Sequence, residues 1–293
     1  NTFVKMTTIK QILKSPNIDQ ELTISGWVRT RRGSKNVSFI ALNDGSTIRN
    51  LQIVAESTVF NEDIIKKINT GACIRAKGLL KSSEGKEQSL EVLAKEITIL
   101  GESDATEYPL QPKKHSLEFL REKAHLRFRT NTFSAVFRVR HALTFAIHDF
   151  FNKNGYVNIH TPIITGADAE GAGEMFKVSN FDFGAIPLND GKVDFSEDFF
   201  GKATNLTVSG QLEAELAALA LGRVYTFGPT FRAENSNTSR HLSEFWMIEP
   251  ETAFADLEDN MNLAENFLKH CIKYCLNNYR EDIDFLNKRL DEE

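Results

Sequence analysis

The chain has only three cysteines, no long apolar run and no excess of positive charge, and each shortage excludes a class of protein. Cys271 and Cys275 lie four residues apart and Cys73 is distant, so neither a disulfide framework nor a zinc-binding CxxC pair is expected. No segment reaches the ~18 apolar residues that cross a bilayer, and the first residues lack the apolar centre of a signal peptide. We therefore expect a cytoplasmic protein with no membrane span.

The balance of charge and hydrophobicity sets the next limits. A formal net charge of -5 excludes a uniformly basic nucleic-acid binder, although a local basic stripe is compatible with that role. A length of 293 residues with 41% hydrophobic content predicts about two packed domains. The charge of each segment is therefore more informative than the total.

The segment from residue 21 to residue 100 has the pattern of a small all-β domain. Short stretches with alternating β-branched residues are separated by polar turns, of which Asp44-Gly45 and Glu84-Gly85 are the clearest. One helical stretch, 60–69, lies between the strands. Five strands and one helix predict an OB-fold β-barrel, the fold that binds oligonucleotides or oligosaccharides.

A change of composition marks the end of this barrel. Residues 101–115 are acidic and polar, and they include Pro109 and Pro112, which cannot continue a regular ladder. We predict an OB-fold domain over 1–103, a hinge over 104–130 and a second domain over 131–293.

The second domain is predicted to be α+β, which makes the whole chain an α+β multidomain protein. It begins with an amphipathic helix that ends at Gly155, and an extended segment follows in which Pro162 favours an edge position. Later strands and helices lack a βαβ rhythm, which favours an antiparallel sheet. The residues from Leu257 onward have a helical pattern.

A basic run in the barrel, "GWVRTRRGSKNVSFI", places Arg29, Arg31, Arg32 and Lys35 near Phe39. Cations follow phosphates and an exposed aromatic ring stacks on an unpaired base, so this run favours nucleic-acid binding. The alternative is a solvated strand edge that discourages strand pairing, with Phe39 in the core.

Two loops of the second domain have the composition of a site for a small polar ligand. In "ADAEGAGEMFKV", glycines separate Glu170 from Glu174, which lets the carboxylates approach a bound ammonium group. In "VSGQLEAE", Gln211 and Glu215 lie four residues apart and therefore on one side of a helix. An ordinary surface turn and an ordinary helix cap are the respective alternatives.

The stretch "FRAENSNTSRHLSEFWMIEPE" has a strand, loop and strand pattern. Arg232 and Glu234 alternate along the first strand and are predicted to point to the same face. A guanidinium clamps a phosphate and a carboxylate accepts from an amine, so this pair suits a nucleotide with an amino-bearing base. Arg240 and His241 add donors for terminal phosphates. The alternative is a structural salt-bridge network.

Taken in order, these motifs resemble one family. The barrel with "GWVRTRR", the helix that leads into "TPIIT", and then "EGAGEMF", "SGQLEAE" and "TFGPTFRAENSNTSRHLSEFWMIEPE" are similar to the asparaginyl-tRNA synthetases, which are class II synthetases of the aspartate, asparagine and lysine subgroup. The resemblance covers nearly the whole chain. It implies an anticodon-binding OB-fold barrel, a hinge, and a class II catalytic domain on an antiparallel sheet that dimerises through motif 1, at about Thr132 to Thr165.

The resemblance also implies an ATP site. Arg232 is the expected catalytic residue and would contact both the α-phosphate of ATP and the carboxylate of the amino acid. Glu234 would bind the adenine side. His241, together with Arg240, would reach the terminal phosphates.

The amino acid implied by the resemblance is L-asparagine. Glu170 and Gln211 would hold its α-ammonium group, and Glu215 would accept from its side-chain amide. Aspartyl enzymes carry a lysine where this chain has Ala214, so the charge favours the neutral amide over aspartate.

In the barrel, the resemblance implies contacts to the anticodon of tRNA(Asn). Phe39 falls where the family stacks the central anticodon base, Gln52 falls where it reads the edge of that base, and Arg29 serves phosphate or base contacts. The implied reaction is ATP-dependent formation of asparaginyl-adenylate and transfer of the asparaginyl group to the tRNA, with Mg2+ assisting.

One departure from the family pattern follows Glu251, because the glycine-rich motif 3 and its adenine-packing arginine are not found. We therefore expect a piece of a longer synthetase, with the magnesium ligand outside it, that is not fully active alone. Three alternatives stay open: an aspartyl enzyme with relaxed tRNA choice, an ammonia-dependent asparagine synthetase, and a non-catalytic RNA-binding protein.

Overall fold

The computed structural model describes residues 7–83, 88–169, 171, 173–236, 238 and 240–291. The chain forms two compact units, one of Asn1–His141 with Leu276–Glu293 and one of Ala142–Cys275. This division does not test the predicted boundaries of the barrel, hinge and second domain, which stay a prediction.

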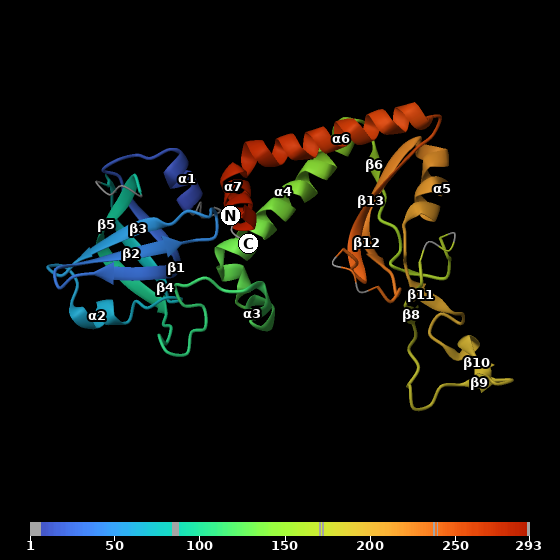
Figure 1. Ribbon diagram of the computed structural model, residues 1–293, viewed down its shortest axis with the longest axis horizontal. Helices are drawn as coiled ribbons and strands as arrows, with labels where there is room; N and C mark the ends of the chain where they lie inside the picture. Colours follow the sequence, from blue (N-terminus) through green and yellow to red (C-terminus); the bar gives the residue numbers. More distant parts are fainter. Residues whose placement is uncertain are drawn as a thin grey trace, which may run out of the picture. The chain divides into compact units, whose positions relative to one another are not determined.

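The first unit contains a closed barrel of five strands in the order β1-β2-β3-β5-β4 (Figure 1), which confirms the predicted OB-fold barrel. Alternation along β2 turns Ile40 and Leu42 into the barrel core, where both are fully buried, and leaves Phe39 on the outer surface. Phe39 is therefore not a core residue. The strands are β1 (Glu21–Gly33), β2 (Val37–Asn43), β3 (Leu51–Glu56), β4 (Cys73–Ser82) and β5 (Leu90–Gly101).

Two short helices accompany the barrel. Helix α2 (Glu62–Lys66) lies between β3 and β4 as predicted, and the side chain of Asn61 caps its first turn. Helix α1 (Ile9–Lys14) was not predicted. Its Ile9 and Ile12 belong to the barrel core, so packing against the barrel stabilises a helix too short to form alone.

The backbone departs from regular strand geometry at two places that matter below. Asp44-Gly45 forms a turn after β2, with Gly45 at φ 84°, whereas the predicted turn at Glu84-Gly85 lies outside the described residues. In β1 the register to β2 shifts between Val28 and Thr30, so Arg29 is the extra residue of a β-bulge. A bulge re-aims the side chain that it carries.

After an irregular segment over 102–116, the rest of the first unit is mostly helical. Asp282 is buried and pairs with Arg138, whose Nη2 lies 2.6 Å from Oδ1 and whose Nε lies 3.1 Å from both carboxylate oxygens. Arg138 also donates to the carbonyl of Gly45 at 3.1 Å, so this pair joins two helices to the turn after β2. The ion pair joins α4 (Asn131–Lys153), whose first turns belong to this unit, to α7 (Arg280–Asp291). The other helices here are α3 (Leu117–Glu122) and the 3-10 helix η1 (Arg127–Arg129).

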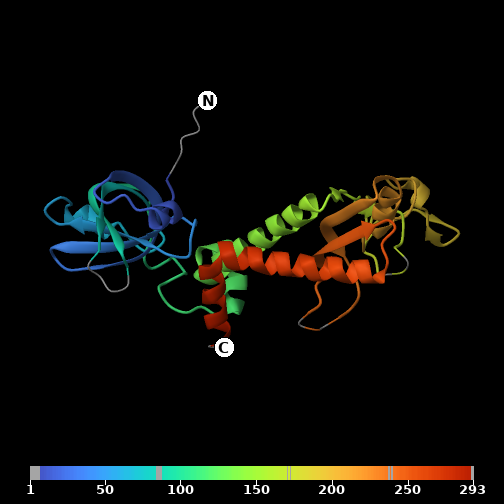
Figure 2. The ribbon, with the colours of Figure 1, turned by 90° about the horizontal axis from the view of Figure 1, so that it is seen from above.

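The second unit is built on a three-stranded sheet of order β13-β12-β6. Strand β12 (Arg223–Phe231) pairs antiparallel with β13 (Glu244–Thr252), as predicted, and parallel with the short β6 (Val157–Asn158). Helix α5 (Gln211–Leu221) lies on one face of the β12–β13 hairpin (Figure 1), and the later part of α4 lies with α6 (Leu257–Asn278) on the other (Figure 2).

The connection from β6 to α5 carries only short elements. They are β7 (Ile164–Thr165), β8 (Lys177–Val178), β9 (Leu188–Asn189), β10 (Lys192–Val193), the 3-10 helix η2 (Phe195–Glu197) and β11 (Thr204–Leu206). Strand β11 pairs with β7 and β8, and β9 pairs with β10.

Aromatic packing fixes the helices to the hairpin. Phe151 of α4 is 1% exposed and stacks on Tyr225 with ring centroids 4.4 Å apart, and Phe267 of α6 packs on the same ring of Phe151. Cys271 lies in this core as a free thiol, and burial, with the neighbouring Cys275, raises its pKa to about 11. Cys73 and Cys275 are likewise free thiols.

Candidate functional site

The β12–β13 hairpin has two faces of different character. Tyr225, Phe227 and Ile248 pack into the core with α4 and α6. Because side chains alternate along a strand, the residues between them point the other way, to what we call the site face. The site face carries Thr226, Gly228, Phe245, Met247, Glu249 and Glu251.

Arg232 stands at the end of the site face, although the prediction that the strand continues to Glu234 is wrong. Strand β12 ends at Phe231 because the chain then leaves the ladder, and the N–H of Ala233 donates to the carbonyl of Glu174 at 2.7 Å. The Arg232 N–H still donates to the carbonyl of Ser243 at 3.0 Å, which holds the residue at the edge of the hairpin.

The guanidinium of Arg232 is held by apolar groups rather than by a carboxylate. It lies 5.4 Å from the ring centroid of Phe245, and its Nη2 lies 3.8 Å from the sulfur of Met247. Its Nε is buried without a hydrogen-bond partner, and no carboxylate among the described residues forms an ion pair with Arg232. Within that part of the chain, the alternative of a structural salt-bridge network is therefore not supported.

Gly173 allows Arg232 and Glu234 to lie on the same side. A Cβ atom placed on Gly173 would be 2.7 Å from Glu234 Oε1 and 3.1 Å from both Cγ and Cδ of Arg232. These distances are shorter than ordinary van der Waals contacts, so a side chain at this position would displace both groups. The two residues therefore face one loop even though they do not share a strand.

Glu249 fixes the turn that begins α5. Its carboxylate accepts hydrogen bonds from the hydroxyl of Ser209, from the N–H of Gly210 at 3.1 Å and from the hydroxyl of Thr226 at 2.9 Å. The N–H of Gln211 in turn donates to Ser209 Oγ at 3.1 Å. The sheet thus sets the position at which Gln211 opens the helix.

Gln211 and Glu215 are joined on one side of α5, as their spacing predicts. Gln211 Nε2 donates to Glu215 Oε1 at 2.9 Å. Burial raises the pKa of Glu251, and the negative charges of Glu215 and Glu249 raise it further. This end of the site face therefore has a negative potential that favours a bound ammonium or amide group. Ala214 is fully buried in the small core of α5 and β12.

The other predicted site residues of this unit form fewer hydrogen bonds than Gln211 and Arg232. His241 is exposed, and its Nδ1 forms a hydrogen bond with the hydroxyl of Thr238. The N–H of Arg240 lies 3.4 Å from the same hydroxyl. Glu170 lies outside the described residues.

The outer surface of the barrel brings together Phe39 and Gln52 in one hollow, and it adds Arg32. Arg32 is paired directly with Phe39 across β1 and β2, so both side chains stand on the same side of the sheet. Gln52 Nε2 donates to Glu91 at 3.0 Å. We call Arg32, Phe39 and Gln52 the barrel face. Arg32 could have been predicted as part of this surface because it lies in the basic run. No pattern in the sequence pointed to Glu91.

Arg29 does not belong to the barrel face. Because of the bulge it lines a second cavity with Tyr108, residues 110–115 and Arg129. Burial, with the nearby charges of Arg138 and Arg129, lowers the pKa of Arg29, whereas Tyr108 acts in the opposite direction. The basic run therefore serves two different surfaces.

Within the described part of the chain, no helix is long and apolar enough to cross a membrane. In the same residues, no three His, Cys, Asp or Glu side chains gather as a set that could hold a metal ion.

The arrangement is that of a nucleic-acid-binding barrel joined to a class II synthetase domain. Residues 22–100 match the OB-fold nucleic acid binding domain, and residues 116–291 match the tRNA synthetases class II (D, K and N). The second match covers more than half of the chain. The chain therefore belongs to the class II tRNA synthetases of the D, K and N group.

The similarity to known proteins is close along the whole chain. The asparagine–tRNA ligase of Cytophaga hutchinsonii is 59% identical, and the match covers 99% of this chain and 63% of that protein. The asparagine–tRNA ligase of Parabacteroides distasonis is 57% identical, with 99% and 62% covered. This chain thus spans less than two thirds of the length of these relatives.

A solved structure shows the same architecture. The crystal structure of asparaginyl-tRNA synthetase from Pyrococcus horikoshii complexed with asparaginyl-adenylate matches with a TM-score of 0.80 and 26% identity, covering 96% of this chain and 61% of that chain. The resemblance to asparaginyl-tRNA synthetases predicted from the sequence motifs is thus confirmed.

Proposed function

We propose that the full-length protein is an asparaginyl-tRNA synthetase, an aminoacyl-tRNA ligase of protein synthesis. The asparagine carboxylate attacks the α-phosphorus of ATP, the bond to the bridging oxygen breaks, and pyrophosphate leaves. A ribose hydroxyl at the end of tRNA(Asn) then attacks the carbonyl of asparaginyl-adenylate, and AMP leaves. The substrates supply every reacting group, so the protein acts by orienting them and neutralising charge.

The observation that carries this proposal is the environment of Arg232. Its guanidinium lies against Phe245 and Met247, its Nε is buried without a partner, and no carboxylate of the described residues neutralises it. A fixed cation with unused donors suits the α-phosphate and the substrate carboxylate. Glu234, on the same side, would then accept from the adenine amino group.

Replacing Gly173 by alanine is expected to weaken the binding of ATP without unfolding the protein. The new methyl group would lie within 3.1 Å of Arg232 and within 2.7 Å of Glu234, so both side chains must move. We expect the KM for ATP to rise about tenfold, which corresponds to the lower end of the cost of overpacking. Gly184→Ala is the matched control, because this exposed glycine is not part of the site face and a Cβ there would meet only Asp182 Oδ1, at an ordinary contact distance of 3.4 Å.

We infer that the charge of the site makes it prefer asparagine to aspartate. Glu170 and Gln211 are assigned to the α-ammonium group and Glu215 to the side-chain amide. The negative groups around Glu251, and the absence of a cation at Ala214, disfavour a second carboxylate on the substrate. His241 and Arg240, in the loop between β12 and β13, are assigned to the terminal phosphates.

For the RNA partner, we assign the barrel face to the central anticodon base of tRNA(Asn). Phe39 stacks on that base, Gln52 bonds its edge, and Arg32 provides a cation in addition to the predicted Arg29. Phe39→Ala is expected to weaken tRNA binding by about tenfold or more, since stacking on an aromatic ring contributes about 1–3 kcal/mol per base. Filter binding measures this, and unchanged affinity would contradict the assignment.

Dimerisation, magnesium and location complete the proposal. Apolar side chains in the motif 1 segment are exposed, among them Phe145 at 53% and Ile164 at 43%, which supports a homodimer through this segment.

ATP is expected to bind together with Mg2+, but the described residues provide no metal cluster, so no step is assigned to the ion. We propose a cytoplasmic location, as for translation in general.

The direct test is asparagine-dependent exchange of labelled pyrophosphate into ATP by the full-length protein, with its intact mass measured on the same sample. We expect exchange with asparagine and little with aspartate. Exchange with aspartate would instead identify an aspartyl enzyme with relaxed tRNA choice. Formation of free asparagine from aspartate and ammonia would identify an asparagine synthetase, and tRNA binding without any exchange would identify an RNA-binding protein.

A further inference from the structure

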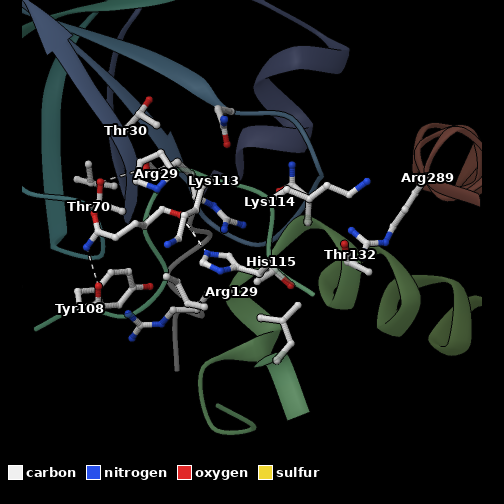
Figure 3. A pocket seen from close by; sticks show the side chains of 18 residues that line it. Arg29, Thr30, Thr70, Tyr108, Lys113, Lys114, His115, Arg129, Thr132 and Arg289 are labelled. Atoms are coloured by element: carbon white, nitrogen blue, oxygen red, sulfur yellow. Dashed lines mark hydrogen bonds between the residues drawn. The ribbon is translucent and has the colours of Figure 1, made fainter. Parts of the chain in front are cut away.

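The first unit contains a cavity with an unusual charge. It has a volume of about 330 Å³, and Figure 3 shows cationic side chains from the barrel, from the segment after it and from α7 around the opening. No aspartate or glutamate is present among the described residues that line it. The basic side chains of this cavity, which we call the basic cavity, are Arg29, Lys113, Lys114, His115, Arg129 and Arg289.

Four of these cations have no carboxylate partner among the described residues. Arg29, Lys113, Lys114 and Arg129 form no ion pair with any carboxylate of the described residues. Arg129 instead lies 5.9 Å from the ring centroids of Trp27 and Tyr108. Bringing like charges together without acids costs free energy, and a bound anion would recover it.

The basic cavity adjoins the barrel face. A second hollow on the outer surface of the barrel also contains Phe39, Arg32 and Gln52, and Thr30 and Asn50 line both this hollow and the basic cavity. A strand whose base stacks on Phe39 would therefore carry its backbone past Thr30 and Asn50 to the cations. Adjacent phosphates of a single strand are close enough to follow such a path.

We propose that the basic cavity binds backbone phosphates of the RNA strand whose base stacks on Phe39. The inference rests on the proposed function, because it takes the barrel face as the anticodon site. Its chemistry is sequence-independent: several cations around one opening attract a phosphodiester without reading a base. The cavity thus adds affinity, while the barrel face supplies the choice of base.

The test compares the double variant Lys113→Gln/Lys114→Gln with Lys66→Gln/Lys288→Gln, which removes the same charge from helices α2 and α7 of the same unit. Both lysines of the test pair are exposed, so folding should be preserved, as a thermal melt would check. The ligand is a 17-nucleotide RNA hairpin with a central loop uridine, and a hairpin with cytidine at that place is the second probe. Affinity is measured across a series of salt concentrations.

We expect the test variant to bind both hairpins about tenfold more weakly than the control variant. Its plot of log Kobs against log salt should be less steep by about 1.4, since each phosphate contact in a single strand contributes about 0.7. Phe39→Ala should reduce the preference for uridine and leave the salt slope unchanged. Equal slopes for the test and control variants would overturn the inference.

A second arm separates RNA phosphate from free phosphate. Inorganic phosphate and pyrophosphate are titrated into the wild-type protein and the test variant by calorimetry. If the test variant loses binding of these ions but binds RNA like the control, the cavity is a site for free phosphate and the RNA assignment is wrong. The exchange assay with asparagine does not depend on either result, so failure of this inference is distinguishable from failure of the proposed function.

Discussion

Replacing Arg232 by alanine in the full-length protein is expected to lower the rate of asparagine-dependent pyrophosphate exchange by about 10³-fold or more. The proposed transition state gathers charge on the α-phosphate, and this guanidinium is the fixed cation of the site face. Loss of one such preorganised donor costs about 10²–10³ in rate, and loss of an arginine on a transferring phosphoryl group costs about 10³–10⁵. The folded structure should survive, because Arg232 forms no ion pair among the described residues.

Two controls make this result specific. Arg232→Lys keeps the charge but not the planar fork, so we expect it to recover only a small part of the activity. Arg223→Ala removes a cation from the exposed start of the same strand and should leave exchange within about twofold of the wild type, since surface substitutions have small effects. If Arg232→Ala retained wild-type exchange, the assignment of the site face as the catalytic site would be wrong.

The elements were predictable from the sequence wherever one pattern determined them. The barrel strands alternate, α4 has a helical period that ends at Gly155, and the glycine at 222 ends α5. Helix α1 was missed because its formation depends on burial of Ile9 and Ile12 in a core made by strands that are distant in sequence. The pattern of a six-residue helix is too short to predict alone.

The candidate site was predictable in composition but not in detail. Spacing and resemblance named Arg232, Glu234, Gln211 and Glu215 as candidates, and their roles stay predictions. The strand was expected to continue to Glu234, but it ends at Phe231, after which the N–H of Ala233 donates to the carbonyl of Glu174. This hydrogen bond joins two segments that are far apart in the chain, and neither sequence indicates that the other will lie beside it. The turn that Glu249 holds is likewise formed by residues about forty positions apart.

In the barrel, too, the sequence alone does not determine which side chains share a surface. Arg29 and Arg32 lie in one basic run, and alternation alone cannot tell which of them accompanies Phe39. One extra residue at the bulge turns Arg29 to the basic cavity, and the register then places Arg32 opposite Phe39. A shift of one residue in a strand thus decides which cation belongs to which surface.

The largest effect on stability is expected at Asp282, outside both proposed sites. Asp282→Ala leaves the guanidinium of Arg138, whose side chain is only 15% exposed, without its carboxylate, and we expect the unfolding free energy of the first unit to fall by about 3 kcal/mol. Urea unfolding of these 293 residues in a Trp246→Phe background measures this, because Trp27 is then their only tryptophan and lies in the first unit. Glu281→Ala is the matched control: it removes the adjacent acid, whose pairing with Arg49 at 3.4 Å is exposed and contributes at most about 1 kcal/mol.

A second variant separates the charge from the packing. In Arg138→Met/Asp282→Leu, apolar side chains of similar size replace both partners, so no buried charge is left unpaired, and we expect most of the lost stability to return. The carbonyl of Gly45 would then lose its donor, and some of the order of the turn after β2 would be lost with it. If the double variant were as unstable as Asp282→Ala, the loss of stability would come from packing and from the lost hydrogen bond to Gly45. The unpaired charge of Arg138 would then not be its cause.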